Sequence, residues 1–587
     1  MRRIATILTA VASSALVSVS AQTLNIHTQG NVSYAIPAEQ AQRMEYSASG
    51  TMTVMGKALA VADVSSMKVD NSDVTDNTVT VIYEGTGARV VVAGNIMRHV
   101  DAVVEGARVS ISQISTADAD ITYVLTGSSD CGSLSLSGSA NSNILLQGVT
   151  LTSAAGAAID IQSNKVTTVT AAAGTVSSLA DVAGGSHKGA LYCKGNLVLN
   201  GAGTLTVTGN SANGIHAKGY IVVDGLTLGA DVSADAAKAI KAGDYLTIAS
   251  GTVSSAATGN GVWSEEDVKT KAAACLAADG NLTVAGGAVT LRATGSGGKG
   301  VNCDADFGMT GGRLDIATSG GILVYSNGTL SHNYTGNTDN IASDMKSSPK
   351  GIKADGNVNI SGGLINVTTT GNGAEGIESK SVLTVTGGTI NAHTTDDALN
   401  SSGHMYIKGG EITAVATGND ALDSNGNLYI EGGLVRAFGA RAPECGLDAN
   451  EEEGYHVIFT GGTVLAVGGS NSVPVANGGS TQAYVSGNAT LSEGQTVTLK
   501  SGTTVLAEFT VPAGYTATGG NTPPAYGPGG GGPGGGGPGG GGPGGSQGGS
   551  VLITCPGLTS GTSYTLTAGT SSSTVTAQMY GSSGRPF

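Results

Sequence analysis

A recurring pair of adjacent glycines constrains the fold of this chain more than any other sequence feature. The pairs lie at Gly286-Gly287, Gly311-Gly312, Gly362-Gly363, Gly387-Gly388, Gly409-Gly410, Gly432-Gly433 and Gly461-Gly462. Successive pairs are 25, 51, 25, 22, 23 and 29 residues apart, and a weaker series at Gly201, Gly225 and Gly251 extends the spacing toward the N-terminus. A repeat this short cannot bury a core alone, so its copies must stack on one another. The pattern indicates a solenoid of short coils.

Two repeats, residues 393–410 and 416–433, align without a gap and predict three short strands in each coil. Within the first copy the strands are expected at 398–400 and 405–407, and the strand after the glycine pair at 411–415. Apolar residues alternate along these segments, and glycine, Asn or Asp occupies the corners, which is typical of β-strands. No helical period of comparable length appears. We therefore expect an all-β protein with a parallel β-helix.

Small side chains support stacked coils. Glycine accounts for 95 of 587 residues, and charged residues for 12% against about 25% in ordinary globular proteins. One position after the third strand of each coil carries only Ala, Ser or Cys and is expected to form an interior column: Cys193, Ala217, Ala242, Ala278, Cys303, Ala354, Ser379, Ser401, Ser424 and Ala449. The remaining cysteines show no CxxC spacing, so we expect mostly free, buried thiols.

The N-terminus has the pattern of a secretory signal peptide over residues 1–21. Arg2 and Arg3 precede an apolar run at 4–17, and Val19-Ser20-Ala21 precedes Gln22. No later apolar stretch is long enough to span a bilayer. These features predict a secreted, periplasmic or cell-surface protein.

The spacing of the repeats suggests the domain organisation. Residues 22–125 carry strand-like runs without the glycine pair and are interpreted as either a separate β module or irregular first coils that cap the helix. The coils run over 126–470, with insertions near 262–271 and 327–349, and hairpin-like strands at 471–522 close the end. The tract 523–549 repeats Pro-Gly-Gly-Gly-Gly and reads as a flexible linker. Strands at 550–587 are expected to belong to the same cap.

Charged residues concentrate in two aligned columns. The corner before each third strand carries Asn213, Lys238, Lys299, Lys350, Glu375, Asp397 and Asp420, and three residues later come His216, Lys241, Asn302, Lys353, Glu378, Asn400, Asp423 and Asp448. Equivalent positions in stacked coils are about 4.8 Å apart. Carboxylates at this distance repel each other and raise each other's pKa. A cation is needed to offset that cost.

Calcium is the natural candidate, because it binds six to eight carboxylate, amide and carbonyl oxygens in adaptable geometry. The in-register words Asp-Ala-Leu-Asn and Asp-Ala-Leu-Asp favour a ladder of ligands. The predicted ligands are Glu375, Glu378, Asp396, Asp397, Asn400, Asn419, Asp420, Asp423 and Asp448. The alternative is that these Asn and Asp residues serve turn geometry by bonding their own backbone.

With its signal peptide, its G-x-x-x-x-G-x-L-x-I-x-G-G-x-I units and the stacked words at 395–399 and 418–422, the chain resembles the bacterial secreted right-handed β-helix proteins described as calcium-binding carbohydrate-binding domains, similar in fold to pectate lyases. The resemblance covers roughly residues 130–515. It implies several calcium ions along one edge and binding of plant cell-wall polysaccharide, with acidic pectins such as polygalacturonate the leading class. It implies nothing for the N-terminal hundred residues or the Gly-Pro tract.

The charge of the chain bears on the choice of sugar. Its formal net charge is -15, so a polyuronate would be repelled unless a cation or a lysine row intervenes. We predict that Lys299, Lys350 and Lys353 contact the sugar, and that Tyr406 and Tyr429 stack on it, although a tyrosine ladder is equally consistent with sheet packing.

Two other functions stay open. One is a calcium-dependent polysaccharide lyase, with Lys350 or Lys353 as base beside Glu375 and Glu378; the other is a structural surface adhesin. Recurrence of lysine on several coils favours a binding protein over an enzyme. We expect a monomer that binds polysaccharide and no nucleic acid.

Overall fold

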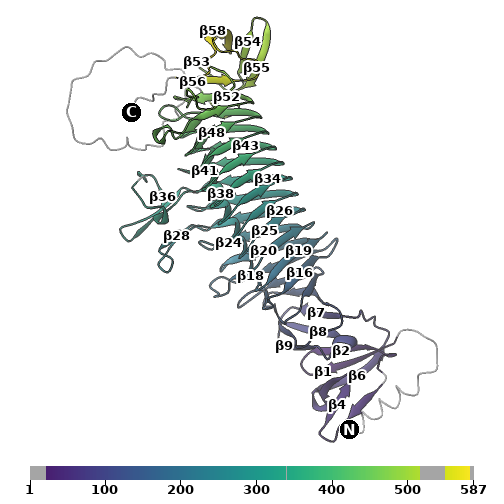
Figure 1. Ribbon diagram of the computed structural model, residues 1–587. Helices are drawn as coiled ribbons and strands as arrows, with labels where there is room; N and C mark the ends of the chain where they lie inside the picture. Colours follow the sequence, from purple (N-terminus) through teal and green to yellow (C-terminus); the bar gives the residue numbers. More distant parts are fainter. Residues whose placement is uncertain (1–21, 42, 339, 516–548, 582–587) are drawn as a thin grey trace. The chain divides into compact units, whose positions relative to one another are not determined.

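The computed structural model describes residues 22–41, 43–338, 340–515 and 549–581. These residues are almost entirely β-structure and form a β-solenoid of about 14 turns, which confirms the predicted fold class (Figure 1). The predicted signal peptide and nearly all of the Gly-Pro tract lie outside the described residues. The chain divides into unit 1, up to Asp231 together with Ile240–Asp244, and unit 2, Val232–Ala239 together with the chain from Tyr245 onward.

Unit 1 begins with strands that pair mostly antiparallel. They are β1 (Thr23–Thr28), β2 (Val32–Pro37), β3 (Met44–Tyr46), β4 (Thr51–Val54), β5 (Lys57–Ala60), β6 (Val64–Asp70), β7 (Thr78–Glu84), β8 (Gly87–Ala93), β9 (Val100–Glu105) and β10 (Arg108–Gln113), with 3-10 helices η1 (Val61–Asp63) and η2 (Gly94–Ile96). Strand β7 pairs in parallel with β11 (Ile121–Ser129), and β10 pairs in parallel with β12 (Ser133–Ser137). The N-terminal strands therefore continue directly into the coils.

The coils of unit 1 contribute strands to three faces. These strands are β13 (Ser142–Leu146), β14 (Thr150–Thr152), β15 (Ile159–Ile161), β16 (Val166–Ala171), β17 (Val176–Ala180), β18 (Gly189–Cys193), β19 (Asn196–Gly201), β20 (Thr204–Gly209), β21 (Asn213–Ala217), β22 (Ile221–Asp224) and β23 (Thr227–Val232). Strand β24 (Lys238–Ala242) spans the division between the units.

Unit 2 repeats the same three-faced coil. One face, called the site sheet here, consists of parallel strands β29 (Ala274–Ala278), β32 (Lys299–Cys303), β38 (Lys350–Ala354), β41 (Glu375–Ser379), β44 (Leu399–Ser401), β47 (Leu422–Ser424) and β50 (Leu447–Ala449). The second face has β25 (Leu246–Ile248), β30 (Leu282–Val284), β33 (Phe307–Met309), β39 (Val358–Ile360), β42 (Leu383–Val385), β45 (Met405–Ile407), β48 (Leu428–Ile430) and β51 (Val457–Phe459). The third has β26 (Thr252–Ala257), β31 (Ala288–Ala293), β34 (Arg313–Thr318), β40 (Leu364–Thr369), β43 (Thr389–Thr394), β46 (Glu411–Ala416), β49 (Leu434–Phe438) and β52 (Thr463–Gly468).

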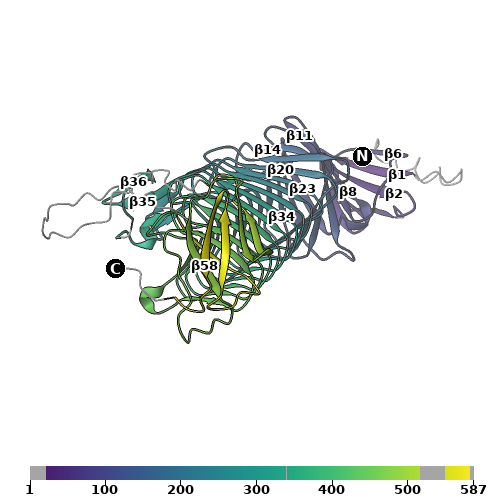
Figure 2. The same ribbon diagram turned by 90° about the horizontal axis from the view of Figure 1, so that it is seen from above.

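The two predicted insertions project from the stack of coils in unit 2. The first is a hairpin of β27 (Val262–Ser264) and β28 (Lys269–Lys271), and the second is a small sheet of β35 (Ile322–Ser326), β36 (Thr329–Tyr334) and β37 (Lys346–Ser347) with 3-10 helix η3 (Ser343–Met345). Figure 2 shows β35 and β36 standing clear of the coils.

The strands after the predicted linker pack against those before it. Strand β56 (Gly549–Thr554) pairs with β52 and with β53 (Tyr484–Ala489), while β54 (Thr496–Ser501), β55 (Thr504–Thr510), β57 (Ser563–Ala568) and β58 (Ser571–Thr576) form a separate sheet. A buried apolar cluster that includes Phe438, Phe509 and Tyr564 lies beneath these strands. The capping strands and the last coils of the solenoid therefore share one hydrophobic core.

The glycine pairs recur because the corner of each coil has no room for side chains. Gly410 has a φ of +86°, which a residue with a Cβ rarely adopts. A Cβ on Gly409 would lie 2.6 Å from the carbonyl oxygen of Thr386 in the preceding coil. The same geometry returns in each coil, and it sets the register of the stack.

The strands predicted from the first copy match the structure to within one residue, and β46 extends one residue further than expected, to Ala416. Strand β45 is as predicted, whereas β44 begins at Leu399, one residue later than expected, because Asp397 and Ala398 belong to the preceding turn. The predicted interior column is buried throughout and in register, as between Ser379, Ser401 and Ser424. None of the six cysteines forms a disulfide bond in the described residues, and five of them are buried, whereas Cys131 is partly exposed. None of the helices in the described ranges has the length and hydrophobicity to cross a bilayer.

Replacing Gly410 by Ala is expected to lower the thermal unfolding midpoint, because Ala tolerates positive φ poorly and its Cβ would lie 2.8 Å from the carbonyl oxygen of Gly388. The expected cost exceeds about 1 kcal/mol. Gly308→Ala is the matched control, since its nearest atoms lie 3.7 Å away and its φ is ordinary. Equal midpoints for the two variants would contradict the corner-packing explanation.

Candidate functional site

The predicted charged columns lie in register on the site sheet. Lys299 lies opposite Lys350, and Lys350 lies opposite Glu375. Three residues further on, the column reads Asn302, Lys353, Glu378, Asn400, Asp423 and Asp448 on successive strands. Basic residues on the earlier strands of the site sheet therefore give way to acidic residues on its later strands.

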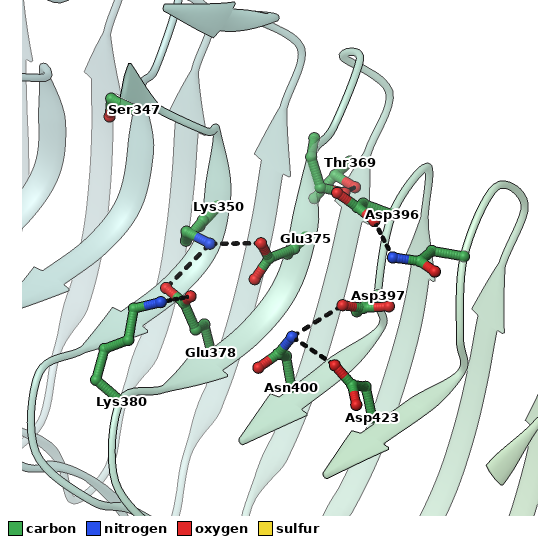
Figure 3. A network of polar contacts seen from close by, with 12 residues as sticks. Ser347, Lys350, Thr369, Glu375, Glu378, Lys380, Asp396, Asp397, Asn400 and Asp423 are labelled. Atoms are coloured by element: carbon green, nitrogen blue, oxygen red, sulfur yellow. Dashed lines mark hydrogen bonds and ion pairs between the residues drawn. The ribbon is translucent and has the colours of Figure 1, made fainter. Parts of the chain in front are cut away.

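Lys350 joins the basic and the acidic parts of the columns. Its Nζ lies 2.6 Å from Glu375 Oε1 and 3.0 Å from Glu378 Oε2, and Lys380 also pairs with Glu378 (Figure 3). Lys350 and Glu378 are only 7% and 2% exposed. This is a buried ion-pair network, so losing one partner would leave an uncompensated charge in the interior.

The ionisable groups in this network have pKa values that are shifted in different directions. Burial lowers the pKa of Lys350, but the two glutamates outweigh it and raise the pKa above its ordinary value. Burial raises the pKa of Glu378, yet Lys350 and Lys380 outweigh it and bring the pKa to about 2. For Glu375, burial together with Glu378 and Asp396 raises the pKa to about 7 despite Lys350. Glu375 Oε2 is also buried without a hydrogen-bond partner in the described residues.

The next two coils carry an acidic ladder, defined here as Asp397, Asp420 and Asp423. The backbone N–H of Asp420 donates to Asp397 Oδ1 at 3.1 Å, and the Asn400 amide bridges Asp397 Oδ2 at 2.8 Å and Asp423 Oδ2 at 3.0 Å (Figure 3). Asp397 and Asp420 are each 5% exposed. Asp397 and Asp420 lie in the turns before β44 and β47, and Asp423 lies within β47, so the three carboxylates lie close together on adjacent coils.

Each carboxyl group of the ladder has a raised pKa. Burial and then Asp396 and Asp423 raise the pKa of Asp397 well above its ordinary value. Burial, followed by the nearby Asp448, raises the pKa of Asp420 to about 8 and that of Asp423 to about 7. In the described part of the chain, no Lys, Arg or His forms an ion pair with any of the three. With no basic partner among the described residues, the ladder therefore retains protons at neutral pH instead of carrying its full negative charge.

The other predicted calcium ligands lie beside the ladder. Asn419 Nδ2 donates to Asp396 Oδ1 at 2.6 Å on the adjacent coil, and Ser472 Oγ donates to Asp448 Oδ1 at 3.1 Å. The structure thus brings the Asp and Asn members together, while Glu375 and Glu378 are engaged by Lys350. The bonds from Asn400 to Asp423 and from Asn419 to Asp396 join side chains of adjacent coils, whereas the bond from Asn400 to Asp397 is local, as the alternative interpretation expects.

The residues of the ladder have the chemistry of a hard-cation site. Across 22–41, 43–338, 340–515 and 549–581, no three His, Cys, Asp or Glu side chains converge on one point for a metal. The donors are nevertheless carboxylate and amide groups, which calcium prefers. The Asn400 amide lies between two carboxylates, and a half-turn of this amide would present Oδ1 in place of Nδ2. Donor type and charge therefore fit calcium.

The lysines predicted to contact sugar differ in accessibility. Lys299 is 6% exposed, its Nζ donates to Gly297 O at 2.9 Å and Ser347 Oγ at 2.7 Å, and burial, then Lys353 and Lys350, lower its pKa well below its ordinary value. Lys350 is equally buried. Lys353 is half-buried and pairs with Asp355. Only Lys353 is placed for direct contact with a polysaccharide.

The predicted tyrosine pair forms a larger aromatic cluster on the second face. The rings of Tyr406 and Tyr429 stack with centroids 4.6 Å apart and planes 6° apart. His404 contacts both rings edge-on at 6.1 and 5.8 Å and also Tyr455 at 5.8 Å, and Lys408 Nζ lies 5.1 Å from the Tyr406 centroid. Sequence reasoning missed these additions. The contact of His404 could have been predicted, because His404 lies only two residues before Tyr406 in the sequence. Tyr455 comes from an irregular loop whose position the repeat does not predict.

Most of the solenoid matches a known protein family. Residues 105–398, 344–421 and 368–518 match a family model described as carbohydrate-binding domain-containing protein. Among solved structures, a polysaccharide lyase-like protein from C. thermocellum, determined as a gadolinium derivative, matches with 14% identity and a TM-score of 0.32, covering 52% of this chain and 96% of that one. No curated protein matches.

Replacing Lys350 by Met is expected to destabilise the protein by about 3–5 kcal/mol, because it leaves buried Glu378 short of its partner. The measurement is the free energy of unfolding in denaturant. Lys353→Met is the matched control and is expected to cost less than about 1 kcal/mol, since the Asp355 partner is exposed. Similar losses for both variants would show that the buried pairing is not what stabilises the site sheet.

The acidic ladder predicts an unusual pH dependence in chelator. A carboxyl whose folded pKa is raised binds more protons folded than unfolded between its unfolded pKa of 3.8 and its folded pKa. For Asp420 and Asp423, stability should therefore fall as the pH rises from about 4 to about 8. The midpoint of thermal unfolding across this range gives the slope. The midpoint of the double variant Asp420→Asn, Asp423→Asn should depend less on pH. An unchanged slope in that variant would contradict the raised pKa values of Asp420 and Asp423.

Proposed function

The chain belongs to the carbohydrate-binding domain-containing family, and from this premise we propose that it binds an acidic plant cell-wall polysaccharide, such as polygalacturonate, through calcium held at the acidic ladder. The observation that carries the proposal is the stack of buried carboxylates at Asp397, Asp420 and Asp423 with raised pKa values and no ion-pair partner in the described ranges. Asp397 and Asp420 each accept a hydrogen bond from a backbone N–H group, but repulsion among the carboxyl groups costs stability, and a bound cation would offset that cost.

The residues named as calcium ligands separate into two groups. Asp396, Asp397, Asn400, Asn419, Asp420, Asp423 and Asp448 are the ligands we retain as the core of the site. Glu375 and Glu378 border it, where Lys350 already offsets part of their charge. When bound, calcium would neutralise the ladder and offer open coordination positions to uronate carboxylates.

Direct sugar contacts are assigned to groups that a polymer can reach. Lys353 lies on the site sheet two strands from the first coil of the ladder, with Glu378 between them, and would pair with a uronate carboxylate. The Tyr406–Tyr429 cluster lies on the adjoining face; because the two rings stack on each other, it would meet a sugar through ring edges and hydroxyl groups. A secreted location remains a prediction from residues 1–21, which lie outside the described residues.

The lyase alternative needs a lysine base, and the geometry gives it little support. Lys350 is held protonated by Glu375 and Glu378. Lys353, the other candidate base, forms an ion pair with Asp355. A base must be neutral and able to reach the substrate proton. We therefore favour binding over cleavage.

The test is retention on immobilised polygalacturonate in calcium and in chelator. Retention is expected in calcium only, and Asp420→Asn with Asp423→Asn should weaken it by more than about ten-fold, since two charged ligands are lost. Glu508→Gln, which removes an exposed acid in the capping sheet, is the matched control. Retention that persists in chelator, or survives the double variant, would contradict the calcium bridge. Ultraviolet absorbance of unsaturated product in the same incubation would instead indicate a lyase.

A further inference from the structure

Unit 1 carries a pocket of about 380 Å³ on the outer surface of β12, β15 and β18, remote in sequence from the acidic ladder. We propose that this pocket binds one uncharged pyranose unit of a polysaccharide without calcium. The proposal rests on the carbohydrate-binding function of the family, but not on the calcium site of unit 2.

The floor of the pocket is a short column of outward-facing side chains. Ser135 lies opposite Asp160, and Asp160 lies opposite Tyr192 on the next strand. The column therefore offers a hydroxyl, a carboxylate and an aromatic ring at successive spacings of about 4.8 Å. This combination spans about the width of one sugar ring.

Two loops and their small or polar residues form the walls. Residues 155–157, Ala-Gly-Ala, border one side, and their lack of bulk leaves the space open. His187 and Lys188 border another side. His187 pairs with Asp181, whose side chain is fully buried, so the loop is anchored to the coil beneath it. The pocket is thus preformed, which limits the entropy lost on binding.

The polar groups of the floor suit sugar hydroxyls. Gln162 Nε2 donates to Asp160 Oδ1 at 2.7 Å, which holds the carboxylate in place. A carboxylate only accepts hydrogen bonds, and its remaining lone pairs call for donors such as hydroxyl groups. Burial raises the pKa of Asp160 despite the bond from Gln162. A hydroxyl donor would satisfy this carboxylate where the surrounding water is reduced.

Tyr192 supplies the apolar side of the site. Its ring is half-buried and meets His216 edge-on, with centroids 5.7 Å apart and planes at 74°. That contact fixes the ring orientation without covering it, because Tyr192 still lines the pocket. A fixed aromatic ring beside hydrogen-bonding groups suits the C–H face of a pyranose.

Asp160 also selects the class of sugar. A uronate would place its own carboxylate in the same small space, where like charges repel. Burial raises the pKa of Asp160, and the nearby His187 opposes this rise. Among the described residues, neither His187, which pairs with Asp181, nor the exposed Lys188 forms an ion pair with Asp160. The pocket therefore favours neutral sugars, in contrast to the acidic polymer proposed for unit 2.

The test is calorimetric titration of the full chain with cellohexaose, xylohexaose and mannohexaose, each in calcium and in chelator. At least one of the three is expected to bind equally in both conditions. Asp160→Asn and Tyr192→Ala should each weaken that binding by about ten-fold or more, the scale of one charged hydrogen bond. Asp118→Asn and Tyr46→Ala, both exposed in unit 1, are the matched controls and should bind as the unaltered chain does.

The outcomes separate this site from the calcium site. Failure of all three neutral oligosaccharides to bind, or binding unchanged by Asp160→Asn and Tyr192→Ala, would overturn the pocket assignment. Tetragalacturonate, titrated in parallel, should respond to chelator and to Asp420→Asn but not to Asp160→Asn. Loss of tetragalacturonate binding in Asp160→Asn would show that the pocket takes uronates, which would overturn the neutral-sugar class. Circular dichroism verifies that each variant is folded.

Discussion

Parallel pairing between successive coils is the constraint on which the rest of this structure depends. It fixes equivalent residues about one strand spacing apart, so any side chain repeated in the sequence is repeated in space. For apolar and small residues this is favourable, as in the interior column through Ser379, Ser401 and Ser424. For charged residues it creates a problem that the protein must solve locally. The glycine corners, such as Gly409 and Gly410, keep this register because a side chain there would collide with the preceding coil.

The site sheet of unit 2 shows two solutions to that problem. At Lys350, one ammonium group lies between Glu375 and Glu378, and charge balances within the protein. One coil later, no basic side chain in the described residues pairs with Asp397, Asp420 or Asp423. These carboxyl groups keep protons at neutral pH or carry unfavourable charge. The boundary between these two solutions is abrupt because one register position changes from Lys to Glu and then to Asp. The proposed binding of a cation, and through it of an anionic polymer, depends on this second, unbalanced part.

The sequence predicted the fold well because, in a stacked repeat, residues that are one repeat apart in the sequence are neighbours in space. The columns through Lys350 and Glu375, and through Asn400 and Asp423, are in the predicted register. Contacts that depend on side-chain conformation were not accessible in this way. Nothing in the spacing indicated that Lys350 would be buried between two glutamates, or that Asn400 would bridge two carboxylates. The pocket over Tyr192 also escaped notice, because its walls come from loops of irregular length that the repeat does not describe.

Proton release on calcium binding is the most direct test of the central claim that the acidic ladder is a cation site. Calorimetric titration with calcium at pH 7, repeated in buffers of different ionisation enthalpy, measures the number of protons released. Because burial and neighbouring acids raise the pKa values of Asp420 and Asp423 to about 8 and about 7, binding should be saturable and should release protons. An absence of saturable heat, or binding that releases no protons, would contradict the account.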